Sequence, residues 1–280
     1  MTSQAPGASP PRTYNLARFL GAALALWLAL PAGSLAAGID IAPHRAAYVL
    51  KLKSAAPGSN IVEATGGMIY VWADTCDGWA VEQRYMLHVV RRDMPRIEMN
   101  ATSVTWESKD GLRYRFNVKR KRNGKLTADV RGEAKLPATG KPGSVRFDKP
   151  ETKILKLPAG TVFPTMHTLK LMKKALAGGR MDRQLMFDGS EVESSNPVST
   201  FILPPREGPK DAVLKPLGPM PVRRMNLAFF DPASGAAEPE FEMSIDMQDN
   251  GVVPRLLFDY GDFQVTGTIA KIEALAKSGC

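Results

Sequence analysis

The sequence has 280 residues, with 37 Lys and Arg against 28 Asp and Glu, so its formal net charge is 37 − 28 = +9. Apolar residues make up 44% of the chain, which excludes a disordered protein. Two cysteines exclude a small disulfide scaffold and a cysteine-rich zinc module, and three histidines leave few ligands for a histidine metal site. We therefore expect a basic globular protein without a metal or a cofactor.

Residues 1–36 are typical of a cleaved export signal, and residues 37–280 are predicted to form a single mature domain. Basic residues precede an apolar run at 19–30, which is too short to span a bilayer. Small residues at the recognition positions predict cleavage after Ala36 or Ala37. No arginine pair precedes the apolar run, which favours the general (Sec) export route and a periplasmic location. An uncleaved N-terminal anchor is the alternative.

In the mature chain, apolar and polar residues alternate with a period of two, which indicates antiparallel strands with one buried face. The clearest case is 241–248, where Phe241, Met243 and Ile245 alternate with polar side chains. We predict a mainly β protein, an antiparallel sheet of roughly a dozen strands. The predicted strands are 44–52, 66–73, 79–89, 96–101, 111–121, 125–136, 152–157, 181–187, 198–203, 222–230, 241–248, 254–260 and 263–273.

Turn residues separate these strands. Asn123 and Gly124 lie between two alternating runs and predict a tight type I′ hairpin. Stretches rich in Pro and Gly at 137–143 and 204–221 are predicted loops. The second loop is either a long surface loop or a boundary between two lobes.

One segment, 164–177, has helical rather than strand spacing. Met166, Leu169 and Met172 recur on one stripe, Pro164 is near the start, and two glycines follow the end. Pro at the beginning and Gly after the end are the usual limits of a helix. We expect an amphipathic helix that covers the sheet or its opening.

The sequence has none of the common catalytic motifs, including Gly-x-Ser-x-Gly, His-Glu-x-x-His and the phosphate-binding loop. His44, His88 and His167 stand alone in the sequence. Each is a general base only if the fold brings a carboxylate to it, and a structural role is the alternative. A periplasmic hydrolase that uses His167 or His88 is therefore our alternative hypothesis.

Basic side chains are concentrated on the hairpin around residues 111–125. A positive face of this kind attracts anionic lipid headgroups or an acidic protein, whereas nucleic acid is not expected in the periplasm. The alternative is a solvated hairpin whose charges protect an edge strand from aggregation. The candidate contact residues are Arg113, Arg115, Lys119, Arg120, Lys121 and Arg122.

Cys76 and Cys280 both reach an oxidising compartment after export, so an intramolecular disulfide is expected. Pairing between two chains, or a reactive Cys280 on a loose tail, is the alternative. No histidine lies close in sequence to either cysteine, which argues against a catalytic thiol.

Two segments carry a family resemblance. Residues 74–79 read DTCDGW and precede an amphipathic strand with Gln83 and Arg84, and residues 157–167 read LPAGTVFPTMH. These segments, together with the terminal Cys280, resemble the family of the alphaproteobacterial cell envelope integrity protein EipB. The resemblance implies paired cysteines, at Cys76 and Cys280, and a spiral-like open β-barrel with a helix near its opening. It also implies a role in maintaining the envelope under stress, without enzymatic activity.

Together these features predict a monomeric periplasmic protein that works by binding. The expected partner is another periplasmic protein or a hydrophobic, lipidic envelope component held in a concave sheet.

Overall fold

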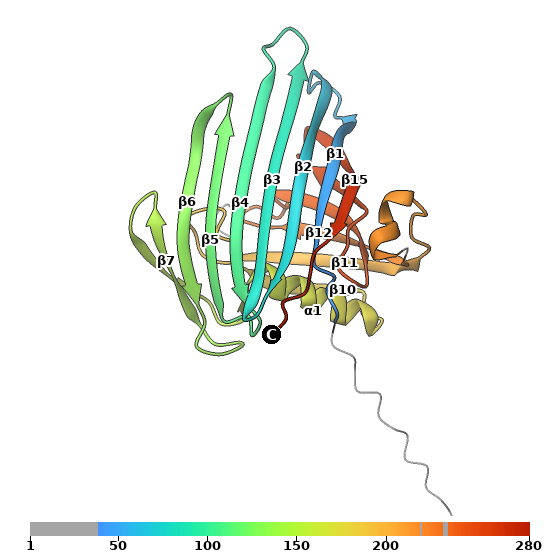
Figure 1. Cartoon of the computed structure of the whole chain (residues 1–280). Helices are drawn as coiled ribbons and strands as arrows, with labels where there is room; N and C mark the ends of the chain where they lie inside the picture. The colour runs from blue at the N-terminus through green and yellow to red at the C-terminus, as the bar shows by residue number, and fades with distance from the viewer. Residues whose placement is uncertain (1–38, 219, 232–234) are drawn as a thin grey trace, which may run out of the picture. The chain divides into compact units, whose positions relative to one another are not determined.

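The computed structural model describes residues 39–218, 220–231 and 235–280 (Figure 1). One sheet of fifteen strands contains all the β-structure of these residues. The predicted export signal, residues 1–36, lies outside the described residues. Within the described ranges, no helix has the length and apolar character needed to cross a membrane.

The elements follow one another mostly as antiparallel hairpins, which is the arrangement expected from short turns between alternating segments. Two helices interrupt the strands, α1 (Pro164–Leu176) and the 3₁₀ helix η1 (Ala212–Leu217). The strands are β1 (His44–Ala55), β2 (Ile61–Thr75), β3 (Gly78–Arg91), β4 (Ile97–Ser108), β5 (Arg113–Arg122), β6 (Lys125–Lys135), β7 (Gly143–Lys149), β8 (Lys153–Leu157), β9 (Thr161–Val162), β10 (Met181–Met186), β11 (Asn196–Arg206), β12 (Val222–Phe229), β13 (Phe241–Gln248), β14 (Arg255–Asp259) and β15 (Phe263–Ala274).

The order of strands in the sheet joins two meanders. The first runs from β8 back to β1 and the second from β15 back to β9, so β1 and β15 are neighbours. The ends of the sheet are β8 and β9, which are consecutive in sequence but do not pair. The sheet is therefore nearly closed and barrel-like, with one seam, and the predicted mainly β, curled architecture is confirmed.

The predictions made from turn and helix signals are confirmed for α1 and for the turn between β5 and β6. The helix begins at Pro164 and ends at Leu176, as its spacing predicts. Asn123 (φ 50°) and Gly124 (φ 75°) both have left-handed backbones, as a type I′ turn between β5 and β6 requires.

Sequence patterning missed two strands, and one predicted loop is wrong in its limits. Strand β7 was not predicted because only Val145 and Phe147 carry its alternation, next to a glycine-rich loop. Strand β9 has two residues, too few for any pattern. The predicted loop at 204–221 begins late, because β11 continues through Pro204 and Pro205 to Arg206, and its middle contains η1. A register shift near Pro205 accommodates the missing amide donors.

We call the face of the sheet that carries the buried apolar side chains the inner face. The larger cluster joins β1–β4 to β11–β15 and α1, with Leu50, Leu87 and Val265 fully buried. A smaller cluster under β5–β8 is mainly aromatic, with rings 5.1–6.4 Å apart, the spacing expected of stacked and edge-to-face pairs. Its rings are Tyr114, Phe116, Phe147, Phe163 and Phe187.

Candidate functional site

Strand β4 anchors the first turn of α1. The residue before the helix is Phe163, which has no capping side chain, and no acidic residue lies in the first turn. The carboxylate of Glu107 instead accepts hydrogen bonds from the amides of Thr165 (2.7 Å) and Met166 (2.8 Å). These amides have no partner within the helix, and a carboxylate also suits the positive end of the helix dipole. Glu107 is only 2% exposed, and this burial raises its pKa to about 7.

The two sides of α1 face different surroundings. Leu171, Met172 and Ala175 are buried in the larger core cluster. The polar side, with Lys170, Lys173 and others, turns instead to a groove between α1 and β10. This amphipathic pattern fixes which side of the helix is available to a partner.

The α1–β10 groove has a volume of about 740 Å³. Lys174 crosses it, pairing with the carboxylate of Asp182 and donating to the carbonyl of Met181 at 3.2 Å. Burial disfavours the charged form of Asp182, yet hydrogen bonds from Lys174 and Gln184 keep its pKa below the usual value. The groove is lined by Gly160, Lys170, Lys173, Lys174, Ala177, Gly179, Asp182, Arg183, Gln184 and Leu185.

His167 lies on the buried side of α1 and is 3% exposed. Burial lowers its pKa to about 4, so the ring is neutral at pH 7. Its Nε2 atom has no hydrogen-bond partner within the described part of the chain. The fold therefore does not give His167 the hydrogen-bonded carboxylate that a general base needs.

The other two histidines are also separate from each other. His44 contacts the backbone carbonyl of Ala42 at 2.7 Å through Nδ1. His88 lies 3.2 Å from Glu98, whose other oxygen accepts from Asn100 at 2.7 Å. Of the two histidines proposed for the hydrolase, His88 alone has a hydrogen-bonded carboxylate. No hydroxyl or thiol among the described residues is hydrogen-bonded to His88, so this histidine has no nucleophile to activate.

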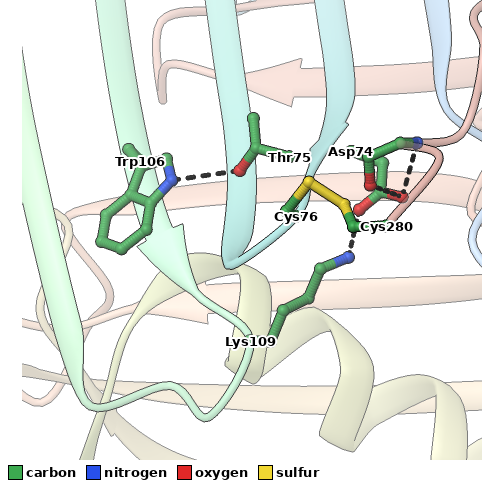
Figure 2. Close-up of a disulfide and its surroundings, with 7 residues drawn as sticks. Asp74, Thr75, Cys76, Trp106, Lys109 and Cys280 are labelled. Carbon is green, nitrogen blue, oxygen red and sulfur yellow. Dashed lines mark hydrogen bonds and ion pairs between the residues drawn. A yellow bond between two sulfur atoms is a disulfide. The ribbon is translucent and has the colours of Figure 1, made fainter.

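A disulfide joins Cys76, in the β2–β3 turn, to Cys280 (Figure 2). The two Cα atoms are 5.7 Å apart and 204 positions apart in sequence. Because both sulfurs are used in this bond, neither is a free nucleophile.

Polar contacts hold the segment before Cys280 beside the same turn. Asp74 accepts hydrogen bonds from the amide (3.2 Å) and the hydroxyl (2.8 Å) of Ser278, and it pairs with Lys109 (Figure 2). The Lys109 ammonium also lies 3.2 Å from the centre of the Trp79 ring, a cation–π contact. The C-terminal segment is thus fixed by several contacts beside the disulfide.

The six basic residues predicted as one contact face lie on two faces. In β5, residues alternate, so Arg113, Arg115, Lys119 and Lys121 lie on the outer face. Arg120 and Arg122 lie opposite them, paired with Ala101 and with Met99, which packs against the larger core cluster.

The outer and inner groups have different partners. Arg115 stacks on Trp106 at 4.4 Å from its ring centre. Arg120 donates to the carbonyl of Ser190 at 3.0 Å and pairs with Glu191, so it holds a loop in place. Charge reversal at Lys119 and Lys121, rather than at Arg120, is therefore the clean test of binding to an anionic surface.

At the end of the inner face away from α1, aromatic side chains remain partly exposed. Phe241 contacts Phe229 and Tyr260, with ring centres 5.7 and 5.9 Å apart. The hydroxyl groups of Tyr85 and Tyr260 are 2.7 Å apart and hydrogen-bonded. Sequence patterning placed Phe241 on a buried face and Phe229 and Tyr260 within predicted strands, but gave no sign that these rings would meet.

Glu107 and the groove were also not predicted. Glu107 is 58 positions from Thr165, and β10 forms one groove wall only because the sheet returns to α1. The one available signal was the set of lysines on the polar side of the predicted helix.

Comparisons with known proteins agree with this architecture. The family model described as EipB-like matches residues 35–276. The cell envelope integrity protein EipB of Brucella abortus (strain 2308) is 31% identical over 270 residues, which cover 93% of this chain and 95% of that protein. A crystal structure of a β-barrel-like protein of the domain of unknown function DUF1849, from Brucella abortus, has a TM-score of 0.77 at 28% identity. The likeness covers 85% of this chain and all of that one. The chain therefore belongs to the EipB-like family, and its relative is named for a role in cell envelope integrity.

Proposed function

We propose that this chain is a non-catalytic periplasmic protein that maintains cell envelope integrity by binding a partner protein in the α1–β10 groove. The observation that carries the proposal is the groove itself, which has about 740 Å³ of space and a row of basic side chains along it. Membership of the EipB-like family supports the envelope role.

The positions of the histidines support a non-catalytic role. His167 is neutral and has no hydrogen-bond partner at Nε2 in the described chain. The hydrolase alternative then depends on the pair of His88 and Glu98. If binding is the function, His88→Ala restores envelope integrity to a deletion strain as well as the unchanged protein does. Loss of rescue by this folded variant would favour the hydrolase.

The periplasmic location rests on two features. Residues 1–36 are predicted to be an export signal, and the two cysteines form a disulfide, which persists in oxidising compartments. Fractionation of cells that express the full chain tests this location, with the mature chain expected in the periplasmic fraction.

Charge reversal in the groove tests its role in cells. The variant Lys173→Glu with Arg183→Glu changes two groove residues, both exposed. The control variant Lys51→Glu with Lys53→Glu makes the same charge change at exposed positions of β1. We expect the groove variant to leave a deletion strain sensitive to detergent, while the control restores resistance. Equal rescue by both variants, at equal melting temperatures, would refute a role for the groove.

A second candidate ligand is an apolar envelope component on the inner face. The partly exposed rings of Phe229, Phe241 and Tyr260, which contact one another on the inner face, favour it. Native mass spectrometry of protein purified from the periplasm would then detect a bound lipid that is lost in Phe241→Ser. A measured mass equal to that of the protein alone, under conditions that preserve other lipid complexes, would exclude this candidate.

A further inference from the structure

The groove exposes an unpaired edge of the sheet. Strand β9 pairs with β10 at two positions, Leu185 and Met186. Beyond them, Met181–Gln184 pairs with β11 on one side, and no strand of the described chain pairs with its other side. This free side faces the groove, because Asp182, Arg183 and Gln184 line it. An unpaired edge is the element to which an added strand binds.

The register shows which backbone groups point to the free side. The amide of Ile202 in β11 donates to the carbonyl of Arg180, so the backbone at position 180 points to β11. Successive residues of a strand point their backbone groups to alternate sides, so those of Met181 and Arg183 point into the groove. Lys174 Nζ reaches the carbonyl of Met181 from that side, at 3.2 Å, which agrees with this direction.

The groove has a positive charge. Lys170, Lys173, Lys174 and Arg183 line it together with a single acid, Asp182, which gives a formal charge of 4 − 1 = +3. Asp182 is already paired with Lys174. The nearby His167 adds no charge, because its ring is neutral. An incoming segment therefore gains most if it carries carboxylates.

The length of the free edge suits a short segment. Four residues of extended chain, from Met181 to Gln184, cover about 13 Å. An added strand would lie in line with β9, with backbone hydrogen bonds to Arg183 and its acidic side chains beside the lysines of α1. Recognition of this type uses main-chain bonds for affinity and side chains for selectivity.

We propose that the α1–β10 groove binds an extended acidic segment of a partner protein, which adds to the free edge of β10 as a further strand. This inference rests on the proposed function, because it names the chemistry of the partner for the same groove.

A synthetic peptide tests the inference without knowledge of the partner. The probe is a short acetylated and amidated peptide in which Glu alternates with Val and Thr. One control peptide has Lys in place of Glu, and another is N-methylated at alternate residues so that it cannot pair with an edge strand. By isothermal titration with the oxidised mature protein, the acidic peptide should bind at least about tenfold more tightly than either control.

Protein variants locate the binding. Lys173→Glu with Arg183→Glu should weaken binding of the acidic peptide about tenfold or more, while Lys51→Glu with Lys53→Glu leaves it unchanged. Amide exchange at Met181 and Arg183 should slow when the peptide is bound. Equal binding of the N-methylated peptide would refute strand addition, and equal binding of the Lys peptide would refute selection for acid.

The outcomes separate the two proposals. If no acidic peptide binds while the groove variant still fails in cells, the added-strand inference is wrong and the groove keeps its role. If the peptide binds as expected but the groove variant rescues cells fully, the proposed function is wrong. If light scattering shows that the mature protein forms a dimer that Arg183→Glu dissociates, a second copy occupies the edge and the acidic partner is refuted.

Discussion

At the end of the sheet that carries α1, a disulfide and charged groups make the main side-chain links, whereas aromatic contacts make them at the opposite end. The first end has the disulfide, the Glu107 carboxylate on α1, and the pair of Lys174 and Asp182. The second has the hydrogen bond of Tyr85 to Tyr260 and partly exposed rings. We therefore expect the helix end, which carries the groove, to contribute more to stability than the aromatic end.

Removal of the disulfide should cause the largest loss of stability at the helix end. The variant Cys76→Ser opens a loop that spans 204 positions, and the chain-entropy model gives a loss of about 5 kcal/mol in the free energy of unfolding. Urea unfolding of the variant and of the oxidised protein measures this loss. The contacts of Ser278 with Asp74 remain in the variant and hold part of the C-terminal segment. Equal melting temperatures of the unchanged protein with and without reductant would contradict the prediction.

The pH dependence of stability tests the buried carboxyl group at the helix end. Burial raises the pKa of Glu107 from 4.5 to about 7, so the folded protein binds this proton more tightly than the unfolded chain does. Its contribution is complete below pH 4.5 and is lost as the pH rises to about 7, a change of about 3 kcal/mol. Other carboxylates act in the opposite direction, so the difference between the unchanged protein and Glu107→Gln isolates this group. A constant difference across that pH range would contradict the assignment.

Removal of the Glu107 side chain tests the anchoring of α1 itself. The variant Glu107→Ala leaves the amides of Thr165 and Met166 without their acceptor and should cost about 2 kcal/mol. Glu151→Ala, at an exposed position, is the matched control and should cost nothing measurable. Hydrogen exchange at the two amides should speed up only in Glu107→Ala. Unchanged exchange there would show that core packing alone holds the helix.

The smallest effect is expected at the aromatic end. The variant Tyr85→Phe removes one hydroxyl from the pair with Tyr260 and should cost about 1 kcal/mol. A double-mutant cycle with Tyr260→Phe measures the coupling between the two hydroxyls. If Tyr85→Phe lowers the free energy of unfolding by more than Glu107→Ala does, the aromatic end contributes more to stability than the helix end, contrary to our expectation.

Sequence patterning located most strands because their alternation is local and long. It found β13 and the limits of α1, where residues two, three or four apart carry the signal. It missed β9, because the pairing of Thr161 with Leu185 depends on the return of a distant strand.

The candidate site was less predictable than the fold. The lysines of α1 were visible as a polar stripe, but the groove needs β10, which lies beyond the helix in sequence. The basic residues of β5 were grouped by composition, although strand alternation puts Arg120 and Arg122 on the inner face. Contacts such as that of Glu107 with Thr165 leave no pattern within a window of sequence.

The pairing of β1 with β15 makes the polypeptide path almost circular. His44 pairs with Ala274, and the amide of Leu275 donates to the carbonyl of Pro43 at 2.8 Å. A short peptide linker between these two points would join the ends, and new termini between β8 and β9 would leave every strand pair intact. Such a circular permutant would place the β1–β15 contact between neighbours in sequence. It should therefore fold faster than the natural order, because its contact order is lower.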